Sequence, residues 1–397
     1  MDHFQILIVG GGNAGISVAS QLLLKDKALD IAIIEPSEKH YYQPAWTLVG
    51  GGDYDIQETE KEEAEVMPDA VTWIREAVAS FEPEQMQLNT TEGNTYSYDA
   101  LVVCPGIQLD WHKIEGLEES LGKHQVCSNY GFDKAPYTWE CIRNFKGGTA
   151  LFTQPATPVK CGGAPQKIMY MAADHFQRNG ILAKSQLEFC SPGKVIFGVK
   201  KYAKSLSQVV ENYGIQLNFR HELIRVDGPG KKATFSVKDD EGGVRELVKP
   251  FDMIHITPPQ SAPDFVKSSP LANDAGWLDL DKYSLQHKKY THVFGLGDAS
   301  GTPNAKTGAA VRKQAPVVVD NLLAVLHQRS LTAQYDGYGS CPLITAKGKL
   351  ILAEFDYNNE PAESFPFDQS KERFSMYQLK RRVLPWMYWN KILKGTA

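Results

Sequence analysis

A glycine-rich turn near the N-terminus constrains the fold of this chain more than any other feature. Gly10, Gly12 and Gly15 are spaced as GxGxxG, between the apolar run 6–9 and the helix-forming stretch 14–25. Glu35 closes the next apolar run, twenty positions after Gly15. In such a βαβ unit the glycines allow a tight turn and a close approach to a pyrophosphate, and the acid accepts from ribose hydroxyls. The pattern predicts an α/β fold with a dinucleotide site at the start of the chain.

Two later apolar runs end in turns that belong to the same kind of sheet. Residues 98–106 finish in a Pro-Gly pair, and residues 290–298 finish in Gly297-Asp298. This arrangement resembles that of flavoproteins with two dinucleotide-binding domains, in which the aspartate contacts the ribityl chain and phosphate of FAD. The segment 306–310 then begins a helix, whose N-terminus favours negative charge on a reduced flavin.

The middle of the chain predicts a second nucleotide-type domain without a nucleotide fingerprint. Residues 149–153 read as a strand and 164–177 as a helix, but the loop between them contains Cys161 instead of GxGxxG. We therefore expect that this domain lacks an NAD(P)H site. The expected organisation is an FAD-binding Rossmann domain (1–107 and 289–330), a second Rossmann-like domain (108–288) and a membrane-associating C-terminal region (331–397).

The six cysteines divide into a reactive pair and four structural residues. Cys161 and Cys341 lie in turns rich in glycine and proline, which favours thiol redox chemistry. Lys160 precedes the first of them and is expected to lower the pKa of its thiol. No CxxC and no metal-ligand spacing is present, so no metal is expected. Buried, structural roles are expected for Cys104, Cys127, Cys141 and Cys190.

The charge distribution points to a partner for the C-terminal tail. The net charge is −5, which gives no reason to expect nucleic acid, yet residues 371–397 hold seven basic residues and one acidic residue. Residues 374–393 mix these bases with aromatics, and Pro385 should divide them into two short helices. This composition is typical of an interfacial membrane helix. The alternative is a helix packed on its own core with a solvated basic face.

The N-terminus carries no signal peptide or presequence, and no window of eighteen uninterrupted apolar residues occurs. These features predict a peripheral membrane protein on the cytoplasmic face of a bacterial membrane. A homo-oligomer is compatible with the sequence, which does not specify the oligomeric state.

Several long and unusual strings identify a known family. The chain resembles the sulfide:quinone oxidoreductases, in particular the group that includes the mitochondrial enzyme of animals, in the segments 40–44, 157–170, 335–338, 340–343, 351–357 and 365–373. The resemblance implies non-covalent FAD, a redox-active pair formed by Cys161 and Cys341, and a quinone acceptor reached from the membrane. Some bacterial members attach FAD covalently, but the context of Cys127 looks like that of the non-covalent group.

The resemblance and the fingerprint together give a set of expected cofactor contacts. They are Gly10, Gly12, Asn13, Ala14, Gly15, Glu35, Gln43, Val78, Gly106, Asp298, Lys306, Thr307, Gly308, Ala309, Ala310 and Val311. A slot for quinone is expected from the aromatic residues Phe355, Phe365, Phe367, Phe374 and Tyr377.

The implied reaction begins when hydrogen sulfide leaves a persulfide on Cys341. Cys161 then passes electrons to FAD and on to quinone, while the sulfane sulfur goes to an acceptor such as sulfite, a thiol or a growing polysulfide. Three alternatives stay open. They are a type-II NADH:quinone oxidoreductase, a soluble sulfide-oxidising flavoprotein with a cytochrome partner, and a non-catalytic flavin-binding redox module.

Overall fold

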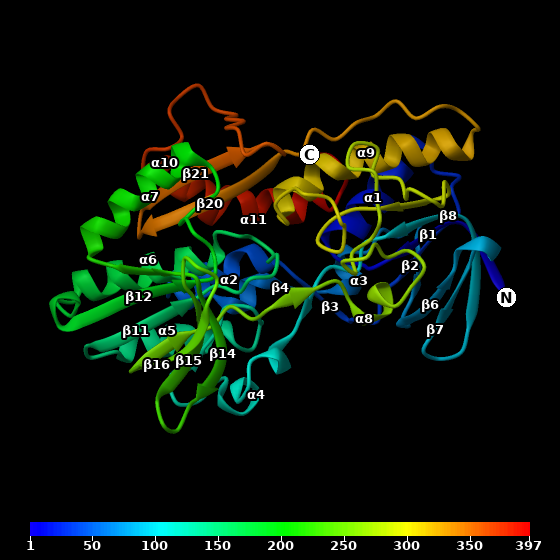
Figure 1. Cartoon of the computed structure of the whole chain (residues 1–397). Helices are drawn as coiled ribbons and strands as arrows, with labels where there is room; N and C mark the ends of the chain where they lie inside the picture. The colour runs from blue at the N-terminus through cyan, green and yellow to red at the C-terminus, as the bar shows by residue number, and fades with distance from the viewer.

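The computed structural model describes residues 1–397, which form two main sheets side by side (Figure 1). The first sheet has the order β5-β2-β1-β8-β7-β6, and β19 pairs with β8. Its parallel strands are β1 (Asp2–Val9), β2 (Ile31–Ile34), β5 (Thr72–Ile74), β8 (Thr95–Val103) and β19 (Val293–Gly295). The antiparallel strands β6 (Val78–Glu82) and β7 (Gln87–Thr90) extend the other edge.

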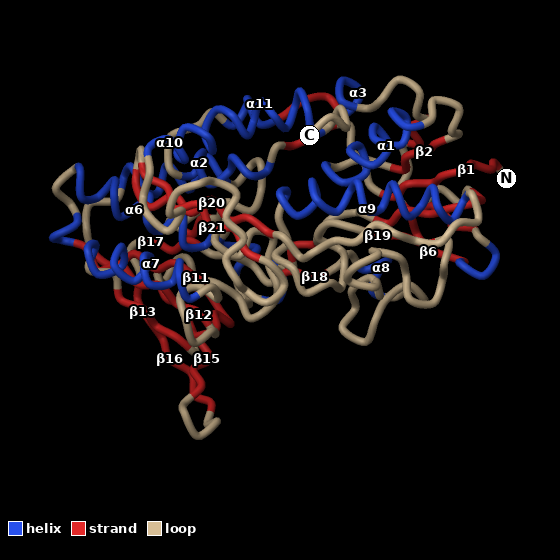
Figure 2. Tube along the Cα trace, turned by 90° about the horizontal axis from the view of Figure 1, so that it is seen from above, coloured by secondary structure: helices blue, strands red, loops and turns tan.

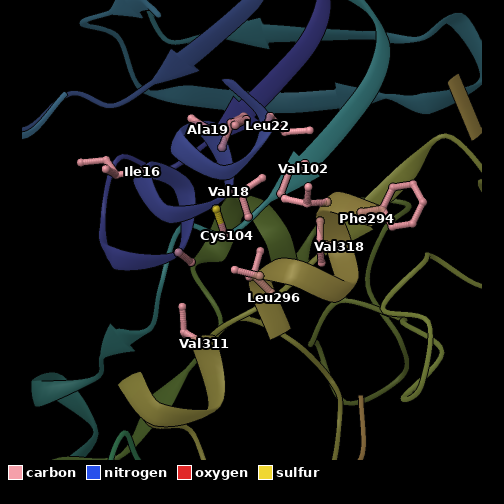
Figure 3. Packing of buried hydrophobic residues seen from close by; sticks show 14 of the residues in the cluster. Ile16, Val18, Ala19, Leu22, Val102, Cys104, Phe294, Leu296, Val311 and Val318 are labelled. Atoms are coloured by element: carbon pink, nitrogen blue, oxygen red, sulfur yellow. The ribbon is translucent and has the colours of Figure 1, made fainter. Parts of the chain in front are cut away.

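The fingerprint unit has the expected structure because its apolar run is covered on both faces. Ile6, Leu7 and Ile8 are fully buried in β1, as a central strand of a parallel sheet requires. Helix α1 (Asn13–Lys25) follows at once and packs beside α9 (Gly308–Leu326). Figure 3 shows side chains of α1, β8 and α9, among them Val18, Val102 and Val318, gathered in this core. The βαβ prediction is confirmed.

The second sheet is parallel throughout and has the order β10-β17-β11-β12-β13. Its strands are β10 (Val126–Cys127), β11 (Gly148–Thr153), β12 (Ser185–Ser191), β13 (Gln216–Phe219) and β17 (Met253–His255). Helices α5 (Ala135–Asn144), α6 (Ala164–Arg178) and α7 (Lys200–Tyr213) pack with it. The expected strand and helix around Cys161 are therefore β11 and α6. The domain boundaries given by the sequence stay a prediction.

Antiparallel elements complete both halves. Strands β14 (His221–Asp227), β15 (Lys232–Lys238) and β16 (Val244–Pro250) form a sheet that projects from the body in Figure 2. The hairpin β20 (Gly339–Ala346) and β21 (Lys349–Phe355) packs against α6. The shorter elements are β3 (Lys39–Tyr41), β4 (Glu60–Glu62), β9 (Gln108–Leu109), β18 (Gln260–Ser261), α2 (Trp46–Gly50), α3 (Glu63–Val66), α4 (Leu117–Ser120) and α8 (Asp264–Lys267).

The C-terminal tail is one continuous helical run, so the predicted break at Pro385 is wrong. The run comprises α10 (Phe374–Gln378), a π-helical turn (Leu379–Val383), α11 (Leu384–Met387) and a second π-helical turn (Tyr388–Ile392). Leu384 N–H bonds to the carbonyl of Leu379, five residues back. This wider turn relieves the clash between a proline ring and the carbonyl four residues before it.

The tail lies across the molecule rather than beside it. In Figure 1 the run crosses from the half that contains β20 and β21 toward α1 and α9. Its end is anchored on α1, because Ser20 Oγ donates to the carbonyl of Leu393 at 2.7 Å. None of the helices combines the length and apolar composition needed to cross a bilayer.

The close contact of α1 with the fingerprint turn gives a stability prediction. A Cβ at Gly15 would lie 1.9 Å from the carbonyl oxygen of Gly10. Because backbone cannot yield as a flexible side chain can, we expect Gly15→Ala to lower the free energy of unfolding by about 1–3 kcal/mol. Gly198→Ala is the matched control, since its nearest neighbour would be 3.6 Å away. Urea unfolding of both variants checks this, and equal stabilities would contradict it.

Candidate active site

A cavity of about 610 Å³ lies where the two halves and the tail meet. It begins at the fingerprint turn and passes the segment 39–47, the loop with Cys161 and the segment 297–312. The β20–β21 hairpin and the tail helix form its far wall. Segments from all parts of the chain therefore contribute to one site, whose volume is typical of a cofactor pocket.

The end of the cavity at the fingerprint has the features of a pyrophosphate and ribose site. Gly10 has φ +104°, and a Cβ there would lie 2.6 Å from the carbonyl oxygen of Cys104. Gly12 faces open space, and no side chain caps the first turn of α1, so backbone N–H groups are left for an anion. Glu35 accepts from the backbone N–H groups of Gly11 and Ser37, each at 2.8 Å.

A buried polar cluster stands beside this end. His40 Nδ1 lies 3.0 Å from Glu63 Oε2, and His40 Nε2 lies 2.6 Å from the hydroxyl of Tyr388 on the tail. Glu63 lines the cavity, is almost fully buried, and has one oxygen, Oε1, without a partner. Such an orphaned acceptor is costly unless a donor arrives. A ribose hydroxyl is a donor that fits it.

The middle of the cavity is framed by Asp298 and the start of α9. The Thr307 side chain accepts from Ala310 N–H at 3.1 Å and so forms the N-cap of α9. Burial raises the pKa of Asp298, against the attraction of Lys306 and Lys160. Burial also lowers the pKa of Lys306 to about 8. A phosphate-bearing ligand would suit this cationic, dry environment.

Most of the predicted cofactor contacts line this cavity, and three do not. Those that do are Gly10, Gly12, Asn13, Ala14, Glu35, Gln43, Gly106, Asp298, Lys306, Thr307, Gly308, Ala309 and Val311. Gly15 and Ala310 act instead in packing and helix capping. Val78 begins the edge strand β6 and packs in the core on that sheet, so its expected cofactor contact stays a prediction. The turn, the orphaned carboxylate and the helix starts fit FAD.

The cysteine pair is brought together as the sequence predicts. Cys161 Sγ and Cys341 Sγ are 3.7 Å apart, although 180 residues separate them in the chain. Cys341 is on β20 and only 2% exposed, whereas Cys161 is partly exposed and lines the cavity. Cys161 has φ +55°, and its N–H donates to the carbonyl of Lys306 at 2.7 Å. A Cβ at Gly163 would lie 2.4 Å from Cys341 Sγ, so only glycine permits this approach.

Lys167, and not Lys160, contacts the thiol of Cys161, which corrects the prediction for Lys160. Lys167 Nζ lies 3.0 Å from Cys161 Sγ. Lys160 Nζ instead donates to Gln43 Oε1 at 2.7 Å. Lys167 ends the first turn of α6, and helical side chains lean toward the N-terminus. In the sequence, a lysine six residues after Cys161, in the first turn of the expected helix, is the feature that indicates this contact.

The electrostatics distinguish the two sulfurs. The hydrogen bond from Cys341, followed by the charges of Lys167 and Lys380, holds the pKa of Cys161 well below its usual value despite burial. Donation to Cys161 and burial raise the pKa of Cys341. The pair therefore holds its first negative charge on Cys161, the sulfur that faces the cavity.

Lys380 is a further buried cation that the sequence did not single out. It reaches from the tail helix into the cavity, and its Nζ donates to the carbonyl of Pro44 at 2.8 Å. Burial, with repulsion from Lys167, lowers the pKa of Lys380 to about 7. Unlike the exposed bases of the tail, Lys380 lines the cavity, and its charge acts on Cys161.

The predicted aromatic slot does not form as a unit. Only Phe365 lines the cavity, stacked on Phe367 with ring centroids 5.3 Å apart. Phe355 belongs to the core of the second half, Tyr377 donates to Asp53, and Phe374 is 65% exposed. The β20–β21 hairpin, the segment after it and the first turns of the tail helix line the cavity with apolar side chains, here called its apolar end: Pro342, Leu352, Phe365, Leu379, Leu384 and Met387.

The other four cysteines are buried, as the sequence predicts. Cys127 does not line the cavity, and its thiol donates to the carbonyl of Ile254 at 3.4 Å. No cluster of three or more His, Cys, Asp or Glu side chains that could hold a metal ion occurs.

Comparisons with known proteins agree with this geometry. A sequence profile of the pyridine nucleotide-disulphide oxidoreductases matches residues 4–135. The chain is 43% identical over 394 residues to the mitochondrial sulfide:quinone oxidoreductase of Mus musculus, covering 99% of this chain and 87% of that protein. It is 46% identical over 394 residues to the mitochondrial sulfide:quinone oxidoreductase of Dictyostelium discoideum, covering 98% and 86% respectively.

A solved structure shows the same fold at a greater distance in sequence. The sulfide:quinone oxidoreductase from the hyperthermophilic bacterium Aquifex aeolicus superposes with a TM-score of 0.82 at 18% identity, covering 100% of this chain and 92% of that one.

The profile matches the N-terminal third of the chain, which is therefore similar to a class of proteins, the flavoprotein oxidoreductases of the pyridine nucleotide-disulphide type. Within this class, identities of 39–46% over nearly the whole length show that the chain belongs to the sulfide:quinone oxidoreductases. The activity predicted from the resemblance is confirmed. The alternatives of an NADH-linked enzyme, a cytochrome-coupled subunit and a non-catalytic module are set aside.

The lysine contact predicts a change in thiol reactivity. Because Lys167 stabilises the thiolate of Cys161, Lys167→Met should raise the pKa of that thiol and move its alkylation profile to higher pH. At neutral pH the reduced variant should therefore react with iodoacetamide more slowly than the parent. Lys160→Met is the control of equal size and should leave the profile nearly unchanged. A larger shift in the control would contradict the assignment.

Proposed function

We propose that Cys161 and Cys341 form the redox pair that takes electrons from sulfide, with FAD bound non-covalently in the cavity beside Cys161. The single observation that carries the proposal is the 3.7 Å approach of the two sulfurs at the cavity wall, with Lys167 at 3.0 Å from one of them. FAD, when bound, supplies the two-electron acceptor between the thiols and quinone. Non-covalent binding is supported by the burial of Cys127 away from the cavity.

The sulfur chemistry starts from a disulfide between the two cysteines. Hydrosulfide attacks Cys341 Sγ, a new S–S bond forms there, and the Cys161–Cys341 bond breaks with its electron pair on Cys161. Cys341 then carries a persulfide and Cys161 a thiolate. A nucleophilic acceptor takes the outer sulfur, which leaves two thiolates. These return to the disulfide when they give up two electrons, so each sulfide yields one sulfane sulfur and one electron pair.

The direction of attack follows from the electrostatics. The better leaving group in thiol exchange is the sulfur of lower pKa, which here is Cys161. Lys167 and Lys380 stabilise the charge that appears on it. The departing thiolate also faces the cavity, where the electrons must go.

Removal of the cavity-facing sulfur tests the relay. Cys161→Ser should bind FAD like the parent, because the serine is nearly isosteric, yet sulfide should no longer bleach the flavin. Anaerobic titration with sulfide, followed at the flavin absorbance band, measures this. Cys190→Ser, at a buried cysteine of the second sheet, is the control and should bleach normally. Full bleaching of Cys161→Ser would overturn the assignment.

We place the quinone at the apolar end of the cavity, between the β20–β21 hairpin and the tail helix. Leu352, Phe365 and Leu379 pack together there and offer an apolar surface. The outer face of the same helix exposes Val383 (43%) and Trp386 (55%) together with Arg382 and Lys391. Basic residues beside exposed Trp and aliphatic side chains suit the surface of an anionic membrane, from which a quinone would enter.

The dual role of the tail decides how membrane binding can be tested. Deletion after residue 375 would also remove Leu384, Met387 and Tyr388 from the cavity wall. The combined variant Phe374→Ser, Val383→Ser and Trp386→Ser changes exposed positions only. Each lost apolar side chain weakens membrane partitioning by roughly 1 kcal/mol or more.

We therefore expect the triple variant to bind vesicles that contain anionic lipid at least about tenfold more weakly, with its melting temperature unchanged. Co-sedimentation with the vesicles measures the binding. Val244→Ser with Val248→Ser removes exposed apolar side chains from β16 and serves as the control. If the triple variant sediments like the parent, the tail is not the membrane contact.

The sulfane acceptor is a nucleophile such as sulfite, a thiol or a polysulfide, and its identity stays a prediction. The same holds for homo-oligomerisation and for the cytoplasmic face of a bacterial membrane, since the relatives compared above are named as mitochondrial proteins.

A further inference from the structure

A buried carboxylate stands at the apolar end of the cavity and takes no part in the sulfur chemistry. Glu354 is on β21, opposite Ser340 and one position from the partner of Cys341. It is 4% exposed and lines the cavity beside Leu352 and Phe365. No lysine or arginine forms a salt bridge with it, and its carboxylate accepts hydrogen bonds from neutral donors.

Three side chains and one backbone group supply those hydrogen bonds. On Oε2, Ser364 donates its hydroxyl at 2.7 Å and its N–H at 2.8 Å, and Gln369 Nε2 donates at 2.7 Å. On Oε1, the hydroxyl of Tyr338 donates. Ser364 is itself exposed to solvent. One hydroxyl therefore connects solvent to a carboxylate that faces the cavity.

The reaction requires such a connection. A quinone becomes a quinol by taking up two electrons and two protons, and an apolar pocket holds little water to supply them. Of the other carboxylates that line the cavity, Glu35 and Glu63 lie at the dinucleotide end, and Asp298 lies between Lys306 and Lys160. Glu354 is thus the carboxylate that belongs to the apolar end.

We propose that Glu354 and Ser364 deliver protons from solvent to the quinone oxygen as it is reduced. In each transfer the Ser364 hydroxyl passes its proton to Glu354 Oε2 and takes a replacement from water, and the neutral acid then protonates the quinone oxygen. Glu354 returns to the carboxylate, held by Tyr338 and Gln369. Two such transfers balance the two electrons that reduce the quinone. This inference rests on the placement of quinone under the proposed function.

The same hydrogen bonds could serve only to hold the segment 360–370 against β21. A structural role and a proton relay can be told apart, because only the relay needs a proton that exchanges with solvent. A structural role needs the hydrogen bonds but no exchangeable path, so it affects stability. A relay needs the hydroxyl proton of Ser364, so it affects the quinone half-reaction and its solvent isotope effect.

Rapid mixing of the holoenzyme separates the half-reactions. Sulfide first reduces the flavin anaerobically, and a short-chain quinone then reoxidises it, in H₂O and in D₂O. We expect Glu354→Gln to slow reoxidation about 100-fold and Ser364→Ala about tenfold, with sulfide reduction unchanged. Ser364→Thr keeps the hydroxyl and should restore the rate. The solvent isotope effect on reoxidation should rise in Ser364→Ala. Melting temperatures of all variants are measured alongside.

The inference is overturned if Ser364→Ala reoxidises like the parent, or if Ser364→Thr is as slow as Ser364→Ala. It is also overturned if slower reoxidation comes only with lower melting temperature and no change in isotope effect. Leu384→Trp tests the placement of quinone separately, because it fills the apolar end. If Leu384→Trp is reoxidised by quinone as fast as the parent, quinone does not bind at the apolar end. If Leu384→Trp blocks reoxidation by quinone while the Glu354 and Ser364 variants react at normal rates, the quinone placement stands and only the proton relay is contradicted.

Discussion

The backbone hydrogen bond from Cys161 N–H to the carbonyl of Lys306, 2.7 Å long, joins a loop of the second sheet to a loop of the first. It holds the loop at Cys161, whose backbone is left-handed, in the place where the thiol meets Lys167. The approach of Cys341 then depends on the absence of a side chain at Gly163. Backbone geometry at Cys161 and Gly163 thus brings the two sulfurs together.

The electrostatics of the cavity suit a negative occupant. Burial lowers the pKa of Lys160 and Lys306 to about 8 and that of Lys380 to about 7, while the thiolate of Cys161 outweighs burial and raises the pKa of Lys167. Lys167, Lys306 and Lys380 are buried, and buried ammonium groups are expensive to keep charged without anions. The pyrophosphate of a dinucleotide and a cysteine thiolate are anions of the right kind, so cofactor binding and thiol activation share one electrostatic cause.

The tail helix links this site to the surface. Its inner face contributes Lys380 and Tyr388 to the cavity, and its outer face exposes Val383 and Trp386. The same turns of this amphipathic helix line the cavity on one face and expose apolar side chains on the other, so no part of the helix has only one of these roles. The bases counted from the sequence are accordingly of two kinds, since Lys380 is buried and Arg382 is exposed.

The dinucleotide-binding unit at the N-terminus could be predicted from the sequence, because its features depend on local chemistry. The turn at Gly10, Gly12 and Gly15, the apolar strand before it and Glu35 predict a βαβ unit because each residue meets a requirement of its own backbone or ligand. The unusual turns around Cys161 and Cys341, together with the family resemblance, predict the redox pair. The helical run through Pro385 was not found, because a π-helical turn depends on the packing around it.

Only the tertiary structure decided which groups meet. Lys167 rather than Lys160 contacts Cys161, Phe365 alone of five aromatics lines the cavity, and Glu354 lies beside the apolar end. These are contacts between side chains whose directions depend on helix phase, strand pairing and the path of distant loops. Spacing in the sequence determines which side chains share a face of one helix or strand. The distances between side chains of different elements depend on how the whole chain packs.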